Sequence, residues 1–166
     1  RPITTPEDLA GIKLRTPSSK WRVAMFKSYG ANPSPLAFSE LFTALQTGVM
    51  DGQENPFTQI YSAKLHEVQK YLSLSGHVYT PAYLTAGAKK WKTYSPDVQR
   101  ALSEAAKEVQ AFVYKEAMAD EGILLDKIKA AGVAVNQTNS AAFVKASDAI
   151  YKEFADGVTG AGALIS

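Results

Sequence analysis

The chain has 166 residues, 46% of them apolar and 20% charged, which is the composition of an ordinary globular domain. A folded domain of this length buries about 70% of the surface that its unfolded chain exposes. The sequence contains no cysteine, which excludes a disulfide scaffold, a thiolate metal site and a cysteine nucleophile.

The charged residues indicate no nucleic-acid partner. Lysine and arginine number 18 against 16 acidic residues, and the two signs are interspersed, whereas nucleic-acid binding requires a concentrated basic stripe. The densest basic cluster, at residues 89–92, is typical of a solvated turn. No apolar stretch approaches the roughly 20 residues that cross a bilayer, and residues 1–3 show no signal-peptide pattern. We therefore expect a mature or trimmed soluble chain with no segment inserted in a membrane.

The first half alternates short helices and strands. Thr5 followed by Pro6 predicts a short helix that ends at Gly11. Alternating apolar and polar residues over 12–15 predict a strand, which ends at Pro17. The further elements expected up to residue 49 are a helix from Ser18 or Ser19 to about Tyr29, an extended piece over 33–37 and a helix over 39–48.

Residues 51–56 form a polar turn, and Pro56 can open a helix that runs to about residue 63. Extended segments are expected at 68–74 and 83–86. Ser95 and Pro96 then begin a helical pattern that continues to about residue 131. This run exceeds the usual helix length, so we expect a bend or break near Gly122. A short strand over 133–135, a final helix from residue 140 and a loose tail over 157–166 complete the chain.

Strands that alternate with helices predict an α/β fold with a mainly parallel sheet. Ligands of such sheets bind beyond the carboxyl ends of the strands. Arg15 lies at the predicted end of its strand and is therefore placed where a ligand would bind.

The sequence contains no group of residues typical of catalysis, of metal binding or of cofactor binding. His66 and His77 lie eleven residues apart without a metal-ligand motif, and both are typical of surface or loop-packing histidines. No nucleophile elbow or phosphate-binding glycine loop is present. The acids Glu40 and Glu54 have no histidine or lysine partner in motif spacing. We therefore predict neither an enzyme nor a bound cofactor.

One group of residues favours recognition of a small anion. Arg15 can offer a planar fork to a carboxylate, and the start of the helix that follows Pro17 adds partial positive charge at the same edge. Considered alone, Arg15 is also typical of a surface or ion-paired strand residue. Asn55 is likewise typical of a turn residue that bonds its own backbone.

Three sequence runs together carry a family resemblance. They are DLAGIKLRTP at residues 8–17, GANPSPLAFSE at 30–40 and ALQTGVMDGQENP at 44–56. In this order and spacing they resemble the periplasmic substrate-binding proteins of tripartite ATP-independent periplasmic (TRAP) transporters. The resemblance implies a periplasmic, two-lobed clamshell that captures an organic acid and passes it to a membrane permease.

The resemblance also implies roles for individual residues. Arg15 corresponds to the arginine that forms a salt bridge with the substrate carboxylate, Asn55 to a polar pocket contact and Phe38 to an apolar wall of the pocket. Phe38 as a core aromatic and Asn55 as a turn residue remain alternatives. Less specific candidates, from segments that can line such a pocket, are Ser18, Trp21 and Tyr79, and Trp21 can equally serve packing. Glu54 is expected to contact a helix or hinge partner, because it would repel an anionic ligand.

Family members are about twice as long, so the resemblance implies one lobe plus fragments of the other. Residues 1–80 are expected to form the ligand-binding lobe, 81–120 a crossing strand and long helix shared with the first lobe, and 121–166 the return to the second lobe. Self-association is then a hypothesis, because Tyr83, Leu84, Trp91 and Tyr94 would be exposed. The alternative function is a ligand-independent structural or oligomerising module.

Overall fold

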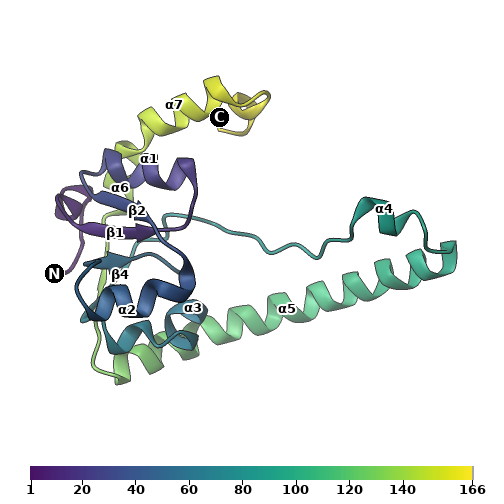
Figure 1. Ribbon diagram of the computed structural model, residues 1–166, viewed down its shortest axis with the longest axis horizontal. Coiled ribbons are helices and arrows are strands. Elements are labelled where there is room, and N and C mark those ends of the chain that lie inside the picture. Colours follow the sequence, from purple (N-terminus) through teal and green to yellow (C-terminus); the bar gives the residue numbers. More distant parts are fainter. Residues whose placement is uncertain (166) are drawn as a thin grey trace.

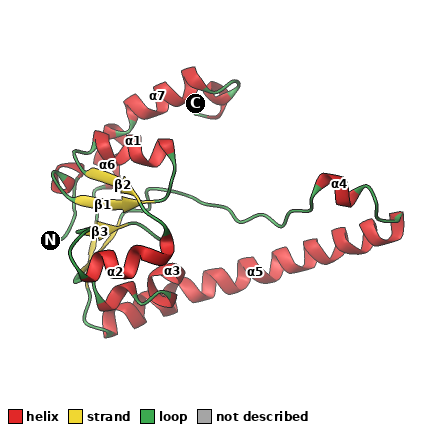
Figure 2. Ribbon diagram, viewed as in Figure 1, coloured by secondary structure: helices red, strands yellow, loops and turns green. Residues whose placement is uncertain are grey.

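Three parallel strands build the first sheet of the computed structural model, which describes residues 1–165 (Figures 1 and 2). The strands are β1 (Lys13–Thr16), β2 (Asn32–Pro35) and β3 (Gly52–Gln53), in the order β2-β1-β3. Arg15 is paired in register with Ser34 on one side and Gln53 on the other. The parallel pairing confirms the predicted α/β class. The turn expected over 51–56 contains β3, because Gly52 and Gln53 pair with β1.

A second sheet contains β4 (Tyr71–Leu74) and β5 (Ala134–Gln137), which are also parallel. The expected strand over 68–74 starts three residues late. Residues Leu65–Glu67 form a 3-10 turn (η3), and the amide of Val68 still donates to the carbonyl of Leu65. The amide of Val68 therefore belongs to the turn and is not part of the strand.

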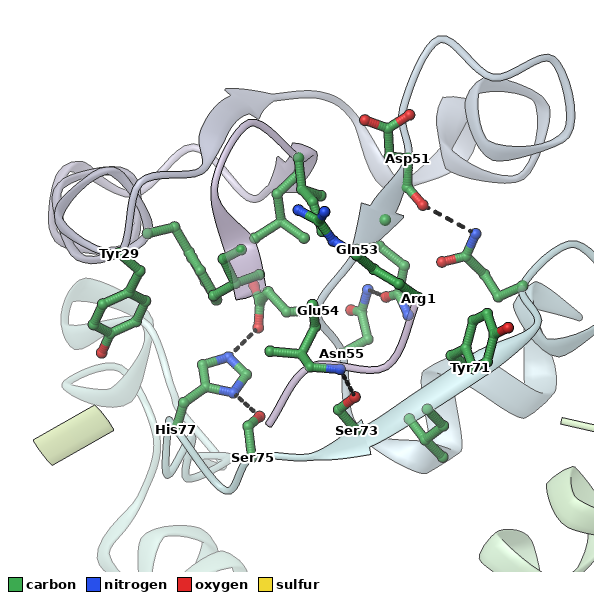
Figure 3. A pocket seen from close by; sticks show the side chains of 18 of the residues that line it. Arg1, Tyr29, Asp51, Gln53, Glu54, Asn55, Tyr71, Ser73, Ser75 and His77 are labelled. Carbon is green, nitrogen blue, oxygen red and sulfur yellow. Dashed lines mark hydrogen bonds and ion pairs between the residues drawn. The ribbon is translucent and has the colours of Figure 1, made fainter. Parts of the chain in front are cut away.

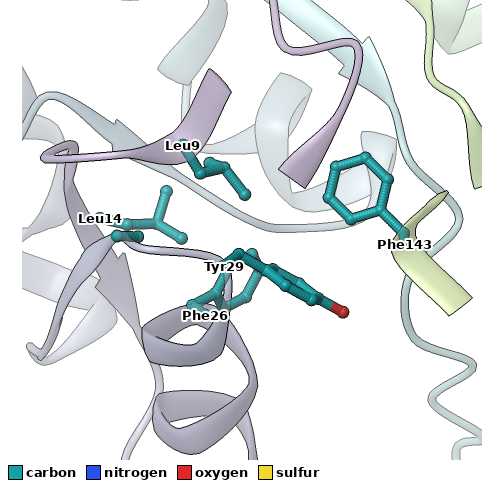
Figure 4. Packing of buried hydrophobic residues seen from close by; sticks show 6 residues of the cluster. Leu9, Leu14, Phe26, Tyr29 and Phe143 are labelled. Carbon is teal, nitrogen blue, oxygen red and sulfur yellow. The ribbon is translucent and has the colours of Figure 1, made fainter. Parts of the chain in front are cut away.

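Helices cover the sheets and create two hydrophobic clusters. The short helices of the first half are η1 (Pro6–Leu9), α1 (Lys20–Ser28), η2 (Phe38–Glu40), α2 (Leu41–Gln46) and α3 (Phe57–Ser62). The first cluster contains Leu9, Leu14, Phe26, Tyr29, Ala31 and Phe143 (Figure 4). The second cluster contains Leu41, Leu45, Ile60, Leu65, Ile128 and Val133. Each cluster joins residues that are far apart in the sequence.

Helix α5 (Pro96–Ala130) is one continuous helix whose first part projects away from the sheets (Figure 1). Ser95 caps its start, where Ser95 Oγ accepts from the amide of Val98. The break expected near Gly122 is wrong. A glycine inside a helix costs only about 1 kcal/mol, which the hydrogen-bonded turns on both sides offset. Only the last turns join the core, through Ile128.

The segment between β4 and α5 contains the short helix α4 (Ala88–Trp91) and no strand. The extended segment expected at 83–86 has no strand to pair with, so it forms no ladder. Tyr83 and Leu84 are almost fully exposed, as expected. Trp91 and Tyr94 are instead half-buried, because their rings pack edge to face with centroids 6.3 Å apart.

The C-terminal part contains two helices, α6 (Ser140–Ala146) and α7 (Asp148–Gly157), where one was expected. They meet at the buried Ser147, whose Oγ donates to the carbonyl of Phe143 and lies 2.6 Å from Oη of Tyr29. The tail expected to be loose contains a 3-10 turn, η4 (Ala161–Leu164), in which Ala161 is buried. Its last residue, Ser166, lies outside the described residues. Within residues 1–165, no helix has both the length and the apolarity needed to span a membrane.

Candidate functional site

The carboxyl edge of the first sheet carries three of the predicted site residues. Arg15 is the third residue of β1, Phe38 follows β2 at the start of η2, and Asn55 follows β3. Because parallel strands all end at the same edge, these three positions converge although they span 41 residues of sequence.

Arg15 is buried, with one side of its guanidinium already bound. Its Nε donates to the carbonyl of Leu36 at 2.8 Å, and Cζ lies 5.8 Å from the centroid of the Phe38 ring. Among the described residues, neither Nη nitrogen of Arg15 has a hydrogen-bond partner. Burial lowers the pKa of the guanidinium, and nearby Glu54 opposes that effect. The two Nη groups are the donors that a planar carboxylate can engage.

Glu54 is the buried anion of the site. Its Oε1 accepts from Nη1 of Arg22 on α1 at 2.5 Å. Its Oε2 lies 3.1 Å from Nε2 of His77, as Figure 3 shows. Burial by itself would raise the pKa of Glu54, but the hydrogen bonds from His77 and Arg22, together with the positive charge of Arg22, hold it below its usual value. The predicted helix or hinge partner of Glu54 is thus confirmed.

The network around Glu54 extends into the segment that follows β4. Nδ1 of His77 lies 2.6 Å from Oγ of Ser75, and Nη2 of Arg22 donates to Oγ1 of Thr80 at 3.0 Å. Sequence inspection missed Arg22 and His77, because nothing in their spacing indicates a contact with Glu54. The other histidine, His66, stacks on Tyr61 with the ring centroids 5.0 Å apart.

Asn55 is half-buried, and its Nδ2 donates to Oε1 of Gln53 at 2.5 Å. This contact orients the amide and leaves its carbonyl oxygen without a hydrogen bond within residues 1–165. Asn55 also lines a cavity of about 590 Å³ together with Arg22, Glu54 and Met118 of α5. Arg15 and Phe38 do not line that cavity.

The three less specific candidates form no hydrogen bond or ring contact with Arg15 within residues 1–165. Ser18 is exposed, and the neighbouring Ser19 caps α1. The Trp21 ring packs edge to face on Phe154 of α7, with centroids 5.0 Å apart. Tyr79 is exposed and hydrogen-bonded to Tyr114 of α5, which raises the pKa of its phenol. Ser18 follows the carboxyl end of β1 by two residues, whereas Trp21 lies in α1 and Tyr79 in the segment after β4. The roles of all three as ligand contacts stay predictions.

Comparison with known proteins gives the family. Residues 1–157 match the family described as bacterial extracellular solute-binding protein, family 7. The chain belongs to this family. It is 42% identical over 134 residues to the 2,3-diketo-L-gulonate-binding periplasmic protein of Escherichia coli. The matched stretch covers 81% of this chain and 41% of that protein.

Solved structures agree with this family assignment. A TRAP periplasmic solute-binding protein from Sulfitobacter, with bound β-D-galacturonate, has a TM-score of 0.95 and 32% identity, covering 99% of this chain and 55% of that one. Another, from Polaromonas with bound D-erythronate, has a TM-score of 0.90 and 38% identity over 99% and 54% of the two chains. The chain thus spans about half the length of the relatives it matches.

These comparisons confirm the resemblance to TRAP solute-binding proteins, the fold expected from it and the periplasmic localisation. The family consists of binding proteins of transporters, which also confirms the prediction that the chain is not an enzyme.

Proposed function

We propose that this chain forms the carboxylate-binding lobe of a TRAP-type solute-binding protein for an organic acid. The observation that carries the proposal is the buried guanidinium of Arg15, whose two Nη groups have no hydrogen-bond partner within residues 1–165 at the carboxyl edge of the sheet. A cation in that position, partly desolvated and held by Leu36, is oriented before a ligand arrives. A carboxylate then gains two parallel hydrogen bonds with little reorganisation of the protein.

The ligand class favoured is a sugar acid. Related proteins contain bound galacturonate and erythronate, and the Escherichia coli relative is named for diketogulonate; all three are hydroxylated carboxylates. Asn55 presents an oriented amide to hydroxyl groups, and Phe38 provides an apolar face beside the guanidinium. The proposed partner that receives the acid is the membrane permease of a TRAP transporter.

Calorimetry with β-D-galacturonate and D-erythronate tests the proposal. The measurement uses a protein of full family length, because this chain spans about half the length of its relatives. We expect Arg15→Ala to abolish binding. We expect Arg15→Lys, which keeps the charge but loses the planar fork, to weaken binding about 10- to 100-fold.

Two controls separate carboxylate recognition from general sugar binding. D-galactose carries no carboxylate and should bind neither the natural protein nor the variants. Circular dichroism checks that both variants remain folded. Unchanged affinity for the acids in both Arg15 variants would contradict the proposed role of Arg15, and equal affinity for galactose and galacturonate would contradict the ligand class.

A further inference from the structure

Arg22 is a second guanidinium near the site, and its positive charge is already paired. Its Nη1 donates to Oε1 of Glu54 at 2.5 Å, and its Nη2 donates to Oγ1 of Thr80 at 3.0 Å. Burial, and after it the nearby charge of Arg22, lower the pKa of Arg15, so the two guanidinium groups lie close together. Of these two cations, only Arg15 can receive an anionic ligand without giving up a bond that the fold already makes.

The contacts of His77 fit a neutral ring. Its Nε2 lies 3.1 Å from Oε2 of Glu54, and an ionised carboxylate can only accept, so Nε2 carries a proton. Its Nδ1 lies 2.6 Å from Oγ of Ser75, whose hydroxyl can donate to an unprotonated Nδ1 (Figure 3). The imidazole thus makes both contacts without adding a positive charge to the site.

The cavity of about 590 Å³ that Asn55 lines is unfavourable to a negative charge. Its charged lining residues are Arg22, Glu54 and Glu121 of α5. Arg22 is paired with Glu54, and no ion pair of the described residues involves Glu121. A carboxylate placed in this cavity would therefore meet two like charges. One of them, Glu54, is buried, where solvent and salt screen charge least.

The uncharged part of the same lining suits hydroxyl groups. It contains the polar side chains of Asn55, Ser73, Ser75 and Thr80. Amide and hydroxyl groups both donate and accept hydrogen bonds, so they can pair with the hydroxyls of a sugar acid. The cavity thus offers hydrogen bonds to a neutral, hydroxylated chain and repels an anionic one.

We infer that the paired Arg22 and Glu54 make the site selective for acids that carry a single carboxylate. This inference rests on the proposed function, in which Arg15 binds that carboxylate and the rest of the acid extends past Asn55 into the cavity. The family alone does not decide the point. The chain is also 37% identical over 131 residues, 79% of this chain and 39% of the relative, to the C4-dicarboxylate-binding periplasmic protein of Rhodobacter capsulatus.

Two acids that differ at one carbon test the inference. D-erythronate has a hydroxymethyl group where meso-tartrate has a second carboxylate, and both chains have four carbons. In calorimetry at pH 7.5 on a protein of full family length, we expect erythronate to bind at least tenfold more tightly than meso-tartrate. The monoamide of meso-tartrate has the length of the diacid but one charge, and it should bind within threefold of erythronate.

Protein variants locate the discrimination. Glu54→Gln removes the buried negative charge and frees Arg22 for a second carboxylate, so the preference for erythronate should fall at least fivefold. Adding Arg22→Gln to this variant should weaken meso-tartrate binding at least fivefold again. Glu121→Gln, at an exposed position, should reduce the preference about twofold without affecting the fold. Glu116→Gln, at an exposed position of α5 outside the cavity, should leave the preference unchanged.

The outcomes separate this inference from the proposed function. Equal affinity of the natural protein for erythronate and meso-tartrate, with both lost in Arg15→Ala, would overturn the inference and leave the proposed function standing. Erythronate binding that survives Arg15→Ala would overturn the proposed function. A monoamide that binds as weakly as the diacid would show selection by size and would overturn the inference. An unchanged preference in a folded Glu54→Gln variant would do the same. If circular dichroism shows that Glu54→Gln is unfolded, the monoamide and Glu121→Gln decide.

Discussion

Nη1 of Arg22 lies 2.5 Å from Oε1 of Glu54, so that helix α1 is tied to the turn after β3. The Glu54 side chain is only 7% exposed, and its carboxylate is shared with His77. The buried Glu54 carboxylate is close enough to Arg15 to affect its pKa. Within the described residues, however, no hydrogen bond joins Glu54 to the Arg15 guanidinium. Arg15 therefore remains available to a second anion.

Removal of the Glu54 charge should destabilise the fold. Glu54→Gln leaves Arg22 and His77 beside a neutral amide, and hydrogen bonds to charged groups contribute about 1.5–3 kcal/mol each. We expect the free energy of unfolding in urea to fall by about 1–3 kcal/mol. Glu40→Gln, at an exposed glutamate without an ion pair in the described chain, is the control. Equal losses in both variants would contradict the role of the Glu54 pairs.

The Glu54 contribution should depend on pH. Its pKa is lowered in the folded state, so its stabilising effect is complete above the pKa of the unfolded chain, about 4.3. That effect disappears as the pH falls through the lower, folded-state pKa. The stability difference between the natural chain and Glu54→Gln should therefore shrink below about pH 4. Urea unfolding at pH 7, 4 and 3 measures it, and a constant difference would argue against the shift.

Phe38 should contribute to ligand affinity rather than to stability. The residue is 42% exposed and its ring lies beside the Arg15 guanidinium. A cation-π contact at an exposed site contributes about 0.5–1 kcal/mol, so Phe38→Leu should weaken acid binding about two- to fivefold. Phe38→Tyr keeps the ring and should bind within twofold of the natural protein. Calorimetry on a family-length protein compares the two, and a large loss of melting temperature in Phe38→Leu would instead indicate a core role.

The continuity of α5 predicts that Gly122→Ala is stabilising. An added Cβ at Gly122 meets no atom within 4 Å, and alanine favours the helix by about 0.5–1 kcal/mol. Gly132, at the end of the same helix, has φ +91° and requires the freedom of glycine. Gly132→Ala should therefore destabilise by about 1 kcal/mol or more. Thermal unfolding measures both, and a destabilised Gly122→Ala would restore the expected break.

The projecting part of α5 should mediate self-association of this chain. Val98, Leu102, Val109 and Phe112 are exposed, and with the exposed Ala105 between Leu102 and Val109 they follow the alternating four- and three-residue spacing of paired helices. We expect light scattering after size-exclusion chromatography to show a concentration-dependent dimer, which the double variant Val109→Ser and Phe112→Ser abolishes. Gln110→Ser, on the same exposed turn, should leave it unchanged. A monomer at several hundred micromolar would contradict this prediction.

Caps and periodicity predicted most of the short elements. Thr5 and Pro6, and likewise Ser95 and Pro96, begin helices because a capping side chain and a proline satisfy local requirements of the backbone. The same reasoning failed for β3, a two-residue strand within polar sequence, and for residues 83–86. A strand forms only where another strand supplies hydrogen bonds, and that information is not local.

Motif order by itself determined the family, and the position of Arg15 at the end of a strand predicted the carboxyl edge. Both follow from local sequence, because strand ends and turns are encoded by neighbouring residues. Only the tertiary structure decided that Glu54 pairs with Arg22 and His77, that α5 passes through Gly122 without a break, and that residues of β3 and β4 line the same cavity. These features depend on contacts between segments that are far apart in the sequence. Such contacts form only when the rest of the fold has brought the segments together, so neighbouring residues do not encode them.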